Sequence, residues 1–332
     1  MKAIMVKEPG GPEQLYIGEV PDPTIGDNDV LLEVRAVGVN RADVLQRKGM
    51  YPPPEGVSEL LGLEVAGVVD RVGTKCRRWK TGDRVFAVIP GGGYAQKAVF
   101  HESLGMPIPE TLDFAQAAAI GEVFLTACQA LFWLGEVKET ENVLIHAGAS
   151  GVGTAAIQLA RQSGCRVLVT AGTEEKVAAC RELGADVGIV YRREDFKDRV
   201  LKETDGRGAD MILDFIGASY LEKNLQSLAV DGRLVILALM GGSRAKEVNL
   251  GLVLIKRLRI IGSTLRSRSL DYRARLAEEF VQRWLPKFCT GDLKPIIDRF
   301  LPWGEAAAAH RRLEENRNIG KIVLTIGEGK DP

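Results

Sequence analysis

The segment from residue 142 to residue 161 constrains the fold of this chain more than any other. It begins with a short apolar run at 143–145, passes through a glycine-rich stretch at 148–153, and continues with apolar residues at helical spacing. Glycines let the backbone turn tightly, so that N–H groups approach a phosphate beside the positive end of a helix. The segment therefore predicts a strand, a phosphate-binding turn and a helix.

The turn differs from the G-x-G-x-x-G pattern of dinucleotide-binding proteins at one position, where serine stands in place of the second glycine. A glycine match alone is weak evidence, but this one lies between a predicted strand and a predicted helix. We therefore expect it to bind the pyrophosphate of a dinucleotide, the alternative being a purely structural turn. The residues expected to contact the cofactor are Gly148, Ser150, Gly151, Val152 and Gly153.

The next predicted strand bears on which dinucleotide binds. Sites selective for NAD usually place a carboxylate at the end of this strand, where it accepts a hydrogen bond from the ribose 2′-hydroxyl. Ala171 and Gly172 stand there instead, with Lys176 in the following helix and Tyr191 after the third strand as candidate contacts for a 2′-phosphate. We therefore expect NADPH rather than NADH, although two glutamates lie close by. The alternative for Lys176 is a solvated helix lysine.

Strand and helix patterns alternate from about residue 121 to residue 264. The strand candidates at 143–145, 167–169, 211–213 and 234–239 are apolar throughout, as a parallel sheet covered on both faces requires. Ligands of such sheets bind beyond the carboxyl ends of the strands. Further candidates for cofactor contacts therefore follow the later strands: Phe215, Leu239, Met240, Ser263, Thr264 and Leu265.

Residues 1 to about 120 have a different texture, with many glycines and prolines and short alternating runs at 30–37, 64–72 and 84–89. These runs predict strands bounded by turns. The last stretch, from 265 to 332, ends in an apolar run at 321–326 that predicts a strand returning to this β-rich lobe. The predicted fold class is α/β, with one β-rich lobe and one doubly wound parallel sheet.

Composition narrows the function classes. The chain has 44 basic and 44 acidic residues, so its balanced charge argues against a nucleic-acid partner. No run of about 18 apolar residues appears, so we expect no membrane span. The first residues lack the apolar core of a signal peptide, which predicts a cytoplasmic location. The five cysteines are far apart in sequence, which argues against disulfides and a cysteine-rich zinc site.

Nearly the whole chain resembles the medium-chain dehydrogenase/reductase superfamily and, within it, the zinc-free quinone oxidoreductases. The residues that carry the resemblance lie at 40–43, 61–67, 90–95, 117–119, 146–153, 183–185 and 318–321. Residues 49–54 and 170–173 favour the subgroup that includes p53-inducible quinone oxidoreductase. The resemblance implies a GroES-like catalytic domain from residues 1–120 and 265–332 and a Rossmann domain from residues 121–264. It also implies a homodimer joined at an edge strand, 259–264.

The resemblance also bears on metal binding. Zinc-dependent members carry a histidine where this chain has Leu63, and a cysteine in the region 40–43, which contains none. We therefore expect no metal. Without a Lewis acid, hydride transfer needs an electron-poor acceptor, such as a quinone. The predicted activity is NADPH-dependent reduction of a quinone. The alternatives are reduction of an enone, enal or enoyl thioester, and a non-catalytic NADPH-binding protein.

Candidate catalytic residues lie in the β-rich lobe. Tyr51 lies in a loop stiffened by three prolines. Its ring clamps the substrate, its hydroxyl lies near the nicotinamide or the acceptor oxygen, or the side chain only packs the loop. By resemblance, Asn40 lies beside the cofactor and hydrogen-bonds ribose or acceptor. The resemblance also implies that Thr126, at the opening of the helix before the Rossmann domain, touches the nicotinamide carboxamide. It gives Asn318 the role of a cofactor clamp. No side chain stands out as a proton donor.

Overall fold

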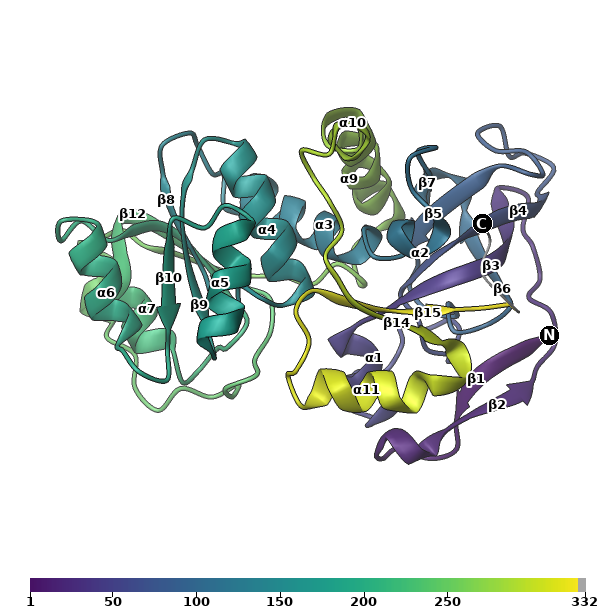
Figure 1. Cartoon of the computed structure of the whole chain (residues 1–332), viewed down its shortest axis with the longest axis horizontal. Coiled ribbons are helices and arrows are strands. Elements are labelled where there is room, and N and C mark those ends of the chain that lie inside the picture. Colours follow the sequence, from purple (N-terminus) through teal and green to yellow (C-terminus); the bar gives the residue numbers. More distant parts are fainter. Residues whose placement is uncertain (328–332) are drawn as a thin grey trace. The chain divides into compact units, whose positions relative to one another are not determined.

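The structure is a computed structural model that describes residues 1–327 of the chain. It divides into two compact units, one formed by Met1–Leu125 with Arg266–Pro332 and the other by Thr126–Leu265 (Figure 1). The expected boundary at residue 120 falls at the start of helix α3 (Gly121–Cys128), whereas the units divide inside this helix. We call them the catalytic unit and the nucleotide unit.

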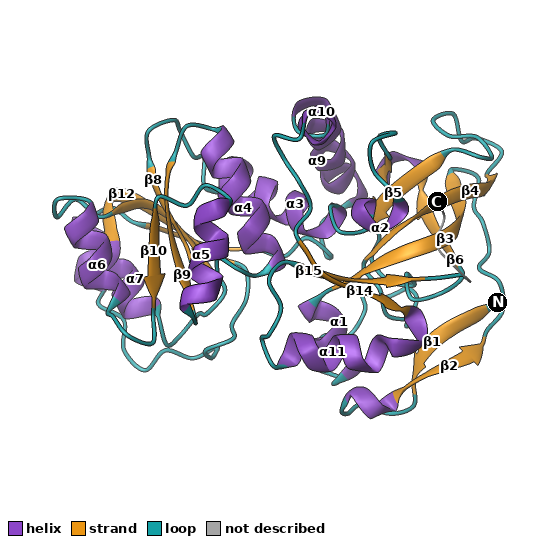
Figure 2. Ribbon diagram, in the orientation of Figure 1, coloured by secondary structure: helices purple, strands orange, loops and turns teal. Residues whose placement is uncertain are grey.

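The nucleotide unit is built on a six-stranded parallel sheet (Figure 2). The strands are β8 (Asn142–Ile145), β9 (Arg166–Ala171), β10 (Val187–Val190), β11 (Ala209–Asp214), β12 (Leu228–Ile236) and β13 (Arg259–Gly262). Their spatial order is β10-β9-β8-β11-β12-β13. This is the strand order of the Rossmann fold, and it confirms the predicted parallel sheet.

One strand prediction was wrong. The apolar run at 234–239 predicts a strand up to Leu239, but β12 ends at Ile236. The Leu237 N–H still donates to the Asp214 carbonyl, after which the chain turns away. Leu239 and Met240 therefore lie in the loop beyond the strand and are about half exposed.

Helices of the nucleotide unit connect the strands. They are α4 (Gly151–Gln162), α5 (Glu174–Glu182), α6 (Phe196–Glu203), α7 (Leu221–Ser227) and α8 (Leu250–Ile255). All residues of α4 from 153 to 160 are buried, because it packs closely beside β8 and β9. The chain adds β9 and β10 on one side of β8 and then β11, β12 and β13 on its other side. The carboxyl ends of β8 and β11 therefore flank the expected ligand-binding edge.

The catalytic unit contains a seven-stranded sheet in the order β14-β15-β3-β4-β5-β7, with β6 also paired to β3, and a separate hairpin of β1 and β2. Its strands are β1 (Lys2–Val6), β2 (Leu15–Glu19), β3 (Asp29–Val39), β4 (Glu64–Val72), β5 (Arg84–Val88), β6 (Lys97–His101), β7 (Gly105–Pro107), β14 (Ile297–Pro302) and β15 (Lys321–Thr325). Strand β15 pairs antiparallel with β3, which confirms that the last strand returns to this lobe.

The helices of the catalytic unit come from both ends of the chain. They are α1 (Arg41–Arg47), α2 (Phe114–Ala117), the first residues of α3, α9 (Leu270–Arg283), α10 (Pro286–Thr290) and α11 (Ala306–Glu314). The apolar core of the unit lies between the sheet and α11, where Ala306 and Ala309 pack with strand residues such as Val37. Residues near both termini are therefore needed for one core.

One helical stretch, Phe114–Leu134, is long and apolar enough to pass a length and hydropathy test for a membrane span. The stretch is not an uninterrupted apolar run, because polar residues such as Gln116 and Glu122 lie within it. Buried core helices of folded proteins have the same length and hydropathy. In this stretch, 72% of the tested window is buried inside the fold.

Candidate functional site

The glycine-rich turn joins β8 to α4. Its first residues are folded tightly, with Ala147 in the left-handed region at a φ of 48°. The hydroxyl of Ser150 caps α4 by accepting a hydrogen bond from the Gly153 N–H at 3.1 Å. A Cβ on Gly153 would lie 2.5 Å from the Ala147 carbonyl oxygen, so this position requires glycine. Serine in place of the second glycine is thus a helix cap.

The turn leaves backbone donors for a ligand. The N–H groups of Gly148, Ser150 and Gly153 are already used within the unit. Across the described part of the chain, no acceptor contacts the N–H groups of Gly151 and Val152, the first two residues of α4. Such donors at a helix N-terminus suit an anion. The turn therefore fits the pyrophosphate of a dinucleotide.

The ends of β9 and β10 lie side by side. The Tyr191 N–H donates to the Ala171 carbonyl at 3.2 Å, and a Cβ on Gly172 would lie 3.1 Å from the Tyr191 hydroxyl oxygen. Lys176 is in the first turn of α5, with its N–H bonded to the capping Thr173 hydroxyl at 3.3 Å. The structure thus brings Gly172 and Tyr191 together and places Lys176 one helical turn away in sequence, with no carboxylate at the end of β9.

The acidic residue nearest to this strand end is paired elsewhere. The Glu174 carboxylate accepts a hydrogen bond from the Arg193 guanidinium at 2.7 Å, and both side chains are exposed. Arg192 lies over the ring of Tyr191, with 6.0 Å between its Cζ and the ring centroid. One arginine of the segment after β10 therefore lies over the Tyr191 ring, and the next one pairs with Glu174.

The later strand ends are joined through their backbones. The buried Asp214 carboxylate accepts hydrogen bonds from the N–H groups of Ile216 and Gly217, while burial raises its pKa to about 6. The Met240 N–H donates to the Phe215 carbonyl at 3.1 Å, which brings the loop containing Leu239 against the end of β11. The remaining candidates, Ser263, Thr264 and Leu265, directly follow β13.

In the catalytic unit, the candidate Asn40 is part of a buried polar cluster with Glu64 and Lys321. The Asn40 side-chain amide donates to Glu64 at 2.9 Å, and its oxygen accepts from the Lys321 ammonium at 2.7 Å. The Lys321 ammonium also lies 2.6 Å from the Glu64 carboxylate. The second Glu64 oxygen accepts from the Glu122 N–H at 2.8 Å. The amide of Asn40 is therefore held in one orientation, although its role toward cofactor or acceptor stays a prediction.

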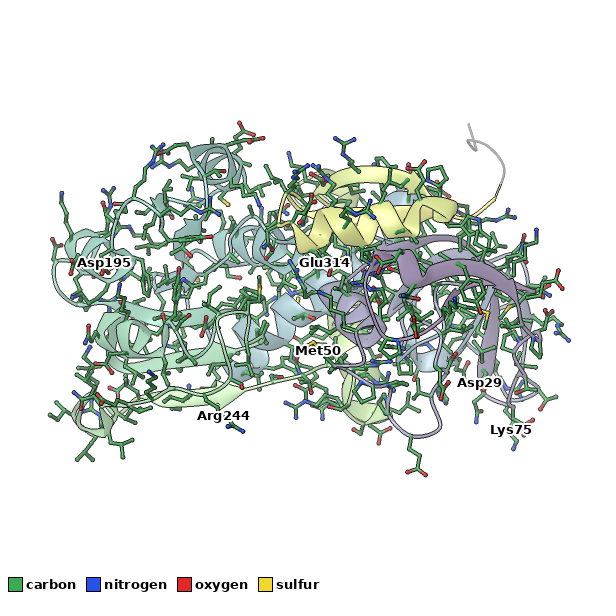
Figure 3. The ribbon with its side chains drawn as sticks, turned by 90° about the horizontal axis from the view of Figure 1, so that it is seen from below. Asp29, Met50, Lys75, Asp195, Arg244 and Glu314 are labelled. Atoms are coloured by element: carbon green, nitrogen blue, oxygen red, sulfur yellow. The ribbon has the colours of Figure 1, made fainter. Side chains whose placement is uncertain are left out.

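A second buried network escaped the sequence analysis. It runs from Glu314 on α11 through Arg47, His310 and Tyr94 to Asp43 on α1. Glu314 is labelled in Figure 3. Since Arg47 donates to His310 Nδ1, the Nε2–H donates to the Tyr94 hydroxyl, which in turn donates to Asp43. Burial and the Arg47 charge lower the pKa of His310 to about 3, and burial raises that of Asp43 to about 6. The histidine is thus neutral.

Tyr51 lies against a buried arginine. Its ring centroid is 5.2 Å from the Cζ of Arg266, which is 7% exposed. Burial raises the pKa of the Tyr51 hydroxyl, and the positive charge of Arg266 opposes this shift. The neighbouring residue Met50, labelled in Figure 3, is exposed. The structure therefore supports a fixed ring for Tyr51, and it adds Arg266 as a partner that sequence reasoning did not assign.

Two further residues carried over from the resemblance, Thr126 and Asn318, lie in defined elements of the structure. Thr126 was expected to open a helix, but it is the sixth residue of α3, because this helix already begins at Gly121. The Asn318 side-chain amide donates to the Gly320 carbonyl at 2.7 Å and is buried in the segment before β15. Their contacts with a cofactor remain predictions.

The residues that replace zinc ligands are not arranged around a metal. Leu63 is buried, and the oxygens of Glu64 accept hydrogen bonds from three neighbours. Among residues 1–327, no group of three or more His, Cys, Asp or Glu side chains is placed to hold a metal ion.

Comparisons with known proteins agree with this architecture. The profile of the alcohol dehydrogenase GroES-like domain matches residues 26–110, and that of the zinc-binding dehydrogenase family matches residues 151–282. Quinone oxidoreductases from rat (Rattus norvegicus) and pig (Sus scrofa) are 33% and 37% identical to the chain. Each comparison covers 98% of both proteins.

Solved structures are similar over 98% of the chain. A quinone oxidoreductase from Escherichia coli complexed with NADPH has a TM-score of 0.89 at 29% identity and is covered completely. An NAD-dependent alcohol dehydrogenase, also covered completely, and the CurK enoyl reductase, covered over 99%, have TM-scores of 0.87 at 33% and 28% identity. From these full-length similarities and its two-unit fold, the chain belongs to the quinone oxidoreductase family of the medium-chain dehydrogenase/reductase superfamily.

Proposed function

We propose that this oxidoreductase uses NADPH to reduce a quinone without a metal ion. The observation that carries the cofactor choice is the end of β9, where Gly172 lies under the Tyr191 hydroxyl and no carboxylate is present. A 2′-phosphate there would meet Tyr191 and Lys176 rather than a negative charge. The pairing of Glu174 with Arg193 further reduces the repulsion.

The residues of the nucleotide unit would hold the cofactor along the carboxyl edge of the sheet. The N–H groups of Gly151 and Val152 would bind the pyrophosphate, and Lys176 and Tyr191 the 2′-phosphate. When bound, NADPH supplies a hydride. Asn40 and Tyr51 would orient the reacting groups, since both side chains are held by neighbours before any ligand arrives.

Independence from zinc is part of the proposal. The Glu64 carboxylate is saturated by the Lys321 ammonium, the Asn40 amide and the Glu122 N–H, so it has little capacity left for a metal. A quinone does not need a Lewis acid, because the negative charge that develops during reduction is delocalised over its ring. The hydrogen bonds that occupy Glu64 therefore support a reaction without a metal, in which the acceptor is electron-poor.

The test is oxidation of NADPH and NADH by chelator-treated protein, with an ortho-quinone, a para-quinone, an enone and an enoyl thioester. We expect quinone turnover that chelation leaves unchanged and that prefers NADPH. Lys176→Ala should raise the KM for NADPH about tenfold and leave that for NADH unchanged. Lys202→Ala, at an exposed lysine of helix α6, is the control. Equal turnover with both nucleotides in the wild type, or no turnover with either quinone, would refute the proposal.

A second candidate is reduction of an enoyl thioester or enone. The similarity to the CurK enoyl reductase favours it, because that protein shares the full length of the fold. Turnover confined to the enone or thioester arm of the same assay would select this candidate. Tight NADPH binding without turnover of any acceptor would instead favour a binding protein.

We also propose that the protein is a homodimer joined at β13. This strand pairs with β12 on one side and forms the edge of the described sheet. Nearby α8 exposes Leu250, Leu254 and Ile255, each more than 70% exposed, and β13 exposes Ile260. An edge strand beside exposed apolar side chains suits pairing with a second copy. Light scattering should give twice the chain mass, and Leu254→Glu should give the monomer.

The balanced charge of 44 basic and 44 acidic residues supports one further part of the proposal, the lack of a nucleic-acid partner. Retention on a nucleic-acid column at physiological salt would contradict this part.

A further inference from the structure

Arg266 is a buried cation that three separate segments of the catalytic unit hold in place. Its Nε donates to the Pro90 carbonyl at 2.6 Å, and its Nη2 donates to the Gln46 side-chain oxygen on α1 at 2.9 Å. The Tyr51 ring lies against the same guanidinium. These contacts fix the plane of the guanidinium, and the Arg266 side chain is almost completely buried.

The third nitrogen of Arg266, Nη1, is shielded from solvent and has no hydrogen-bond partner in the described part of the chain. A buried N–H without an acceptor is unfavourable, and folded proteins rarely retain one. No carboxylate forms an ion pair with Arg266 among these residues. Glu122 and Asp43 influence its pKa only through their charge, and burial lowers it. Arg266 thus keeps both a positive charge and a spare donor.

We propose that Nη1 of Arg266 donates a hydrogen bond to the carbonyl oxygen of the electron acceptor, while the Tyr51 ring packs beside the acceptor. This inference rests on the proposed function. The quinone gains two electrons and one proton from NADPH, and its second proton comes from water. Because negative charge builds up on the quinone oxygen during reduction, a fixed cationic donor stabilises the transition state more than the neutral quinone.

A purely structural role is the competing explanation, since Arg266 joins Pro90 to α1 through its other two nitrogens. The two roles differ in what a substitution changes. Loss of a structural link would lower the thermal unfolding temperature and weaken every kinetic step together. Loss of the acceptor's donor would act on the quinone and spare the nucleotide. Arg266→Lys keeps the charge but loses the forked donor geometry, so it separates these effects.

The experiment compares wild type, Arg266→Ala, Arg266→Lys and Arg268→Ala. Arg268 is a matched control that lies two residues away and stacks on the Tyr272 ring. Duroquinone is the acceptor, because its methylated ring does not add to the exposed thiol of Cys289. We expect Arg266→Ala to raise the KM for duroquinone and lower kcat, each by about tenfold, with the KM for NADPH within about twofold of wild type. Added guanidinium should restore part of this loss.

The inference is overturned if the KM values for duroquinone and NADPH rise together, or if guanidinium restores nothing. If Arg266→Ala does not fold, Arg266→Lys decides by the same criteria at an unchanged unfolding temperature. Calorimetric titration of duroquinone into the protein without NADPH distinguishes a failure of this inference from a failure of the proposed function. A wild type that binds duroquinone through Arg266 but does not turn it over refutes only the quinone reductase. Equal affinity in wild type and Arg266→Ala refutes the role of Arg266 in either case.

Discussion

The Lys321 ammonium lies 2.6 Å from the Glu64 carboxylate, and both side chains are almost completely buried. Lys321 also donates to the Val39 carbonyl and the Asn40 side chain, so the pair joins β15 to β4 and to the end of β3. Two charges buried together are compensated only while both are present. The pair therefore links the last described strand of the chain to the candidate residue Asn40.

Removing one partner of this pair should destabilise the protein strongly. We expect Lys321→Met to cost about 3–5 kcal/mol in the free energy of unfolding, because Glu64 then stays buried without a counter-charge. Urea unfolding followed by circular dichroism measures the change. The double variant Lys321→Met with Glu64→Gln should recover part of the loss. A double variant less stable than Lys321→Met would show that Glu64 is compensated by its other donors alone.

A carboxylate at the end of β9 should reverse the nucleotide preference. Gly172→Asp needs room, since its Cβ would lie 3.1 Å from the Tyr191 hydroxyl, so we combine it with Tyr191→Phe. The ratio of kcat/KM for NADPH over NADH should fall by about tenfold or more, because the aspartate repels a 2′-phosphate. The uncharged control is Gly172→Asn with Tyr191→Phe. The same fall in that control would point to altered packing rather than charge.

Glu122 makes stability depend on pH. Burial, followed by the neighbouring Glu64 charge and that of Asp43, raises the pKa of Glu122 to about 8, while Lys321 and Arg266 oppose the shift. The folded protein thus binds this proton more tightly than the unfolded chain, so stability declines as pH rises from about 4.5 to 8. Glu122→Gln should remove that decline and stabilise the protein at pH 8 by about 1 kcal/mol or more. Parallel pH profiles of the unfolding temperature for both proteins would contradict this.

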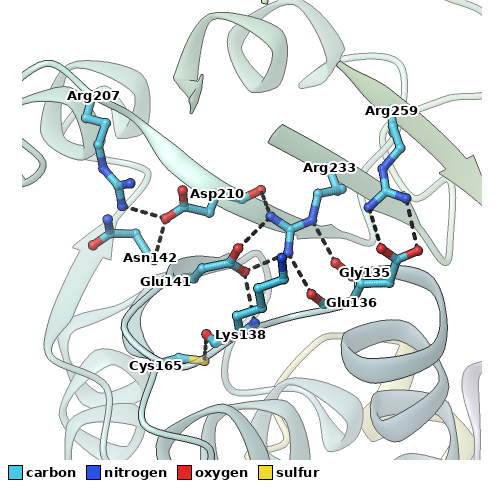
Figure 4. Close-up of polar contacts among 10 residues, drawn as sticks. All are labelled: Gly135, Glu136, Lys138, Glu141, Asn142, Cys165, Arg207, Asp210, Arg233 and Arg259. Atoms are coloured by element: carbon cyan, nitrogen blue, oxygen red, sulfur yellow. Dashed lines mark hydrogen bonds and ion pairs between the residues drawn. The ribbon is translucent and has the colours of Figure 1, made fainter. Parts of the chain in front are cut away.

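Arg233 joins several segments of the nucleotide unit through its guanidinium (Figure 4). Its buried guanidinium pairs with Glu141 at 2.6 Å and donates to the carbonyls of Gly135, Glu136 and Asp210. Arg233→Met should cost about 3–5 kcal/mol, because Glu141 and these carbonyls lose their donor together.

The matched control for Arg233 is its neighbour on the next strand. Arg259 pairs with Glu136 (Figure 4), with 3.0 Å between the closest nitrogen and oxygen. Both side chains are about half exposed. Arg259→Ala should therefore cost less than about 1 kcal/mol. Unfolding temperatures of the two variants, measured side by side, provide the check. Equal shifts would mean that burial does not govern the strength of these arginine contacts.

The sequence predicts features that depend on neighbours along the chain. The strand at 64–72 and the phosphate turn follow from local patterns, alternation in the first and glycine spacing in the second. The end of β12 does not, because the residues that follow Ile236 are as apolar as the strand itself. The contacts of Arg47 with His310 and of Arg266 with Pro90 join residues that are far apart in sequence. A pattern within one segment of the chain does not predict contacts between residues of distant segments.

The network from Glu314 to Asp43 forms only after its last residues have been translated. Arg47 and Asp43 leave the ribosome early, but His310 and Glu314 follow more than 250 residues later. Strand β3 likewise waits for β15. The nucleotide unit, by contrast, consists of one uninterrupted segment and is able to fold while the rest is still being translated. The nascent catalytic unit therefore carries unpartnered charges and an open edge on β3 until the segment up to β15 has been translated.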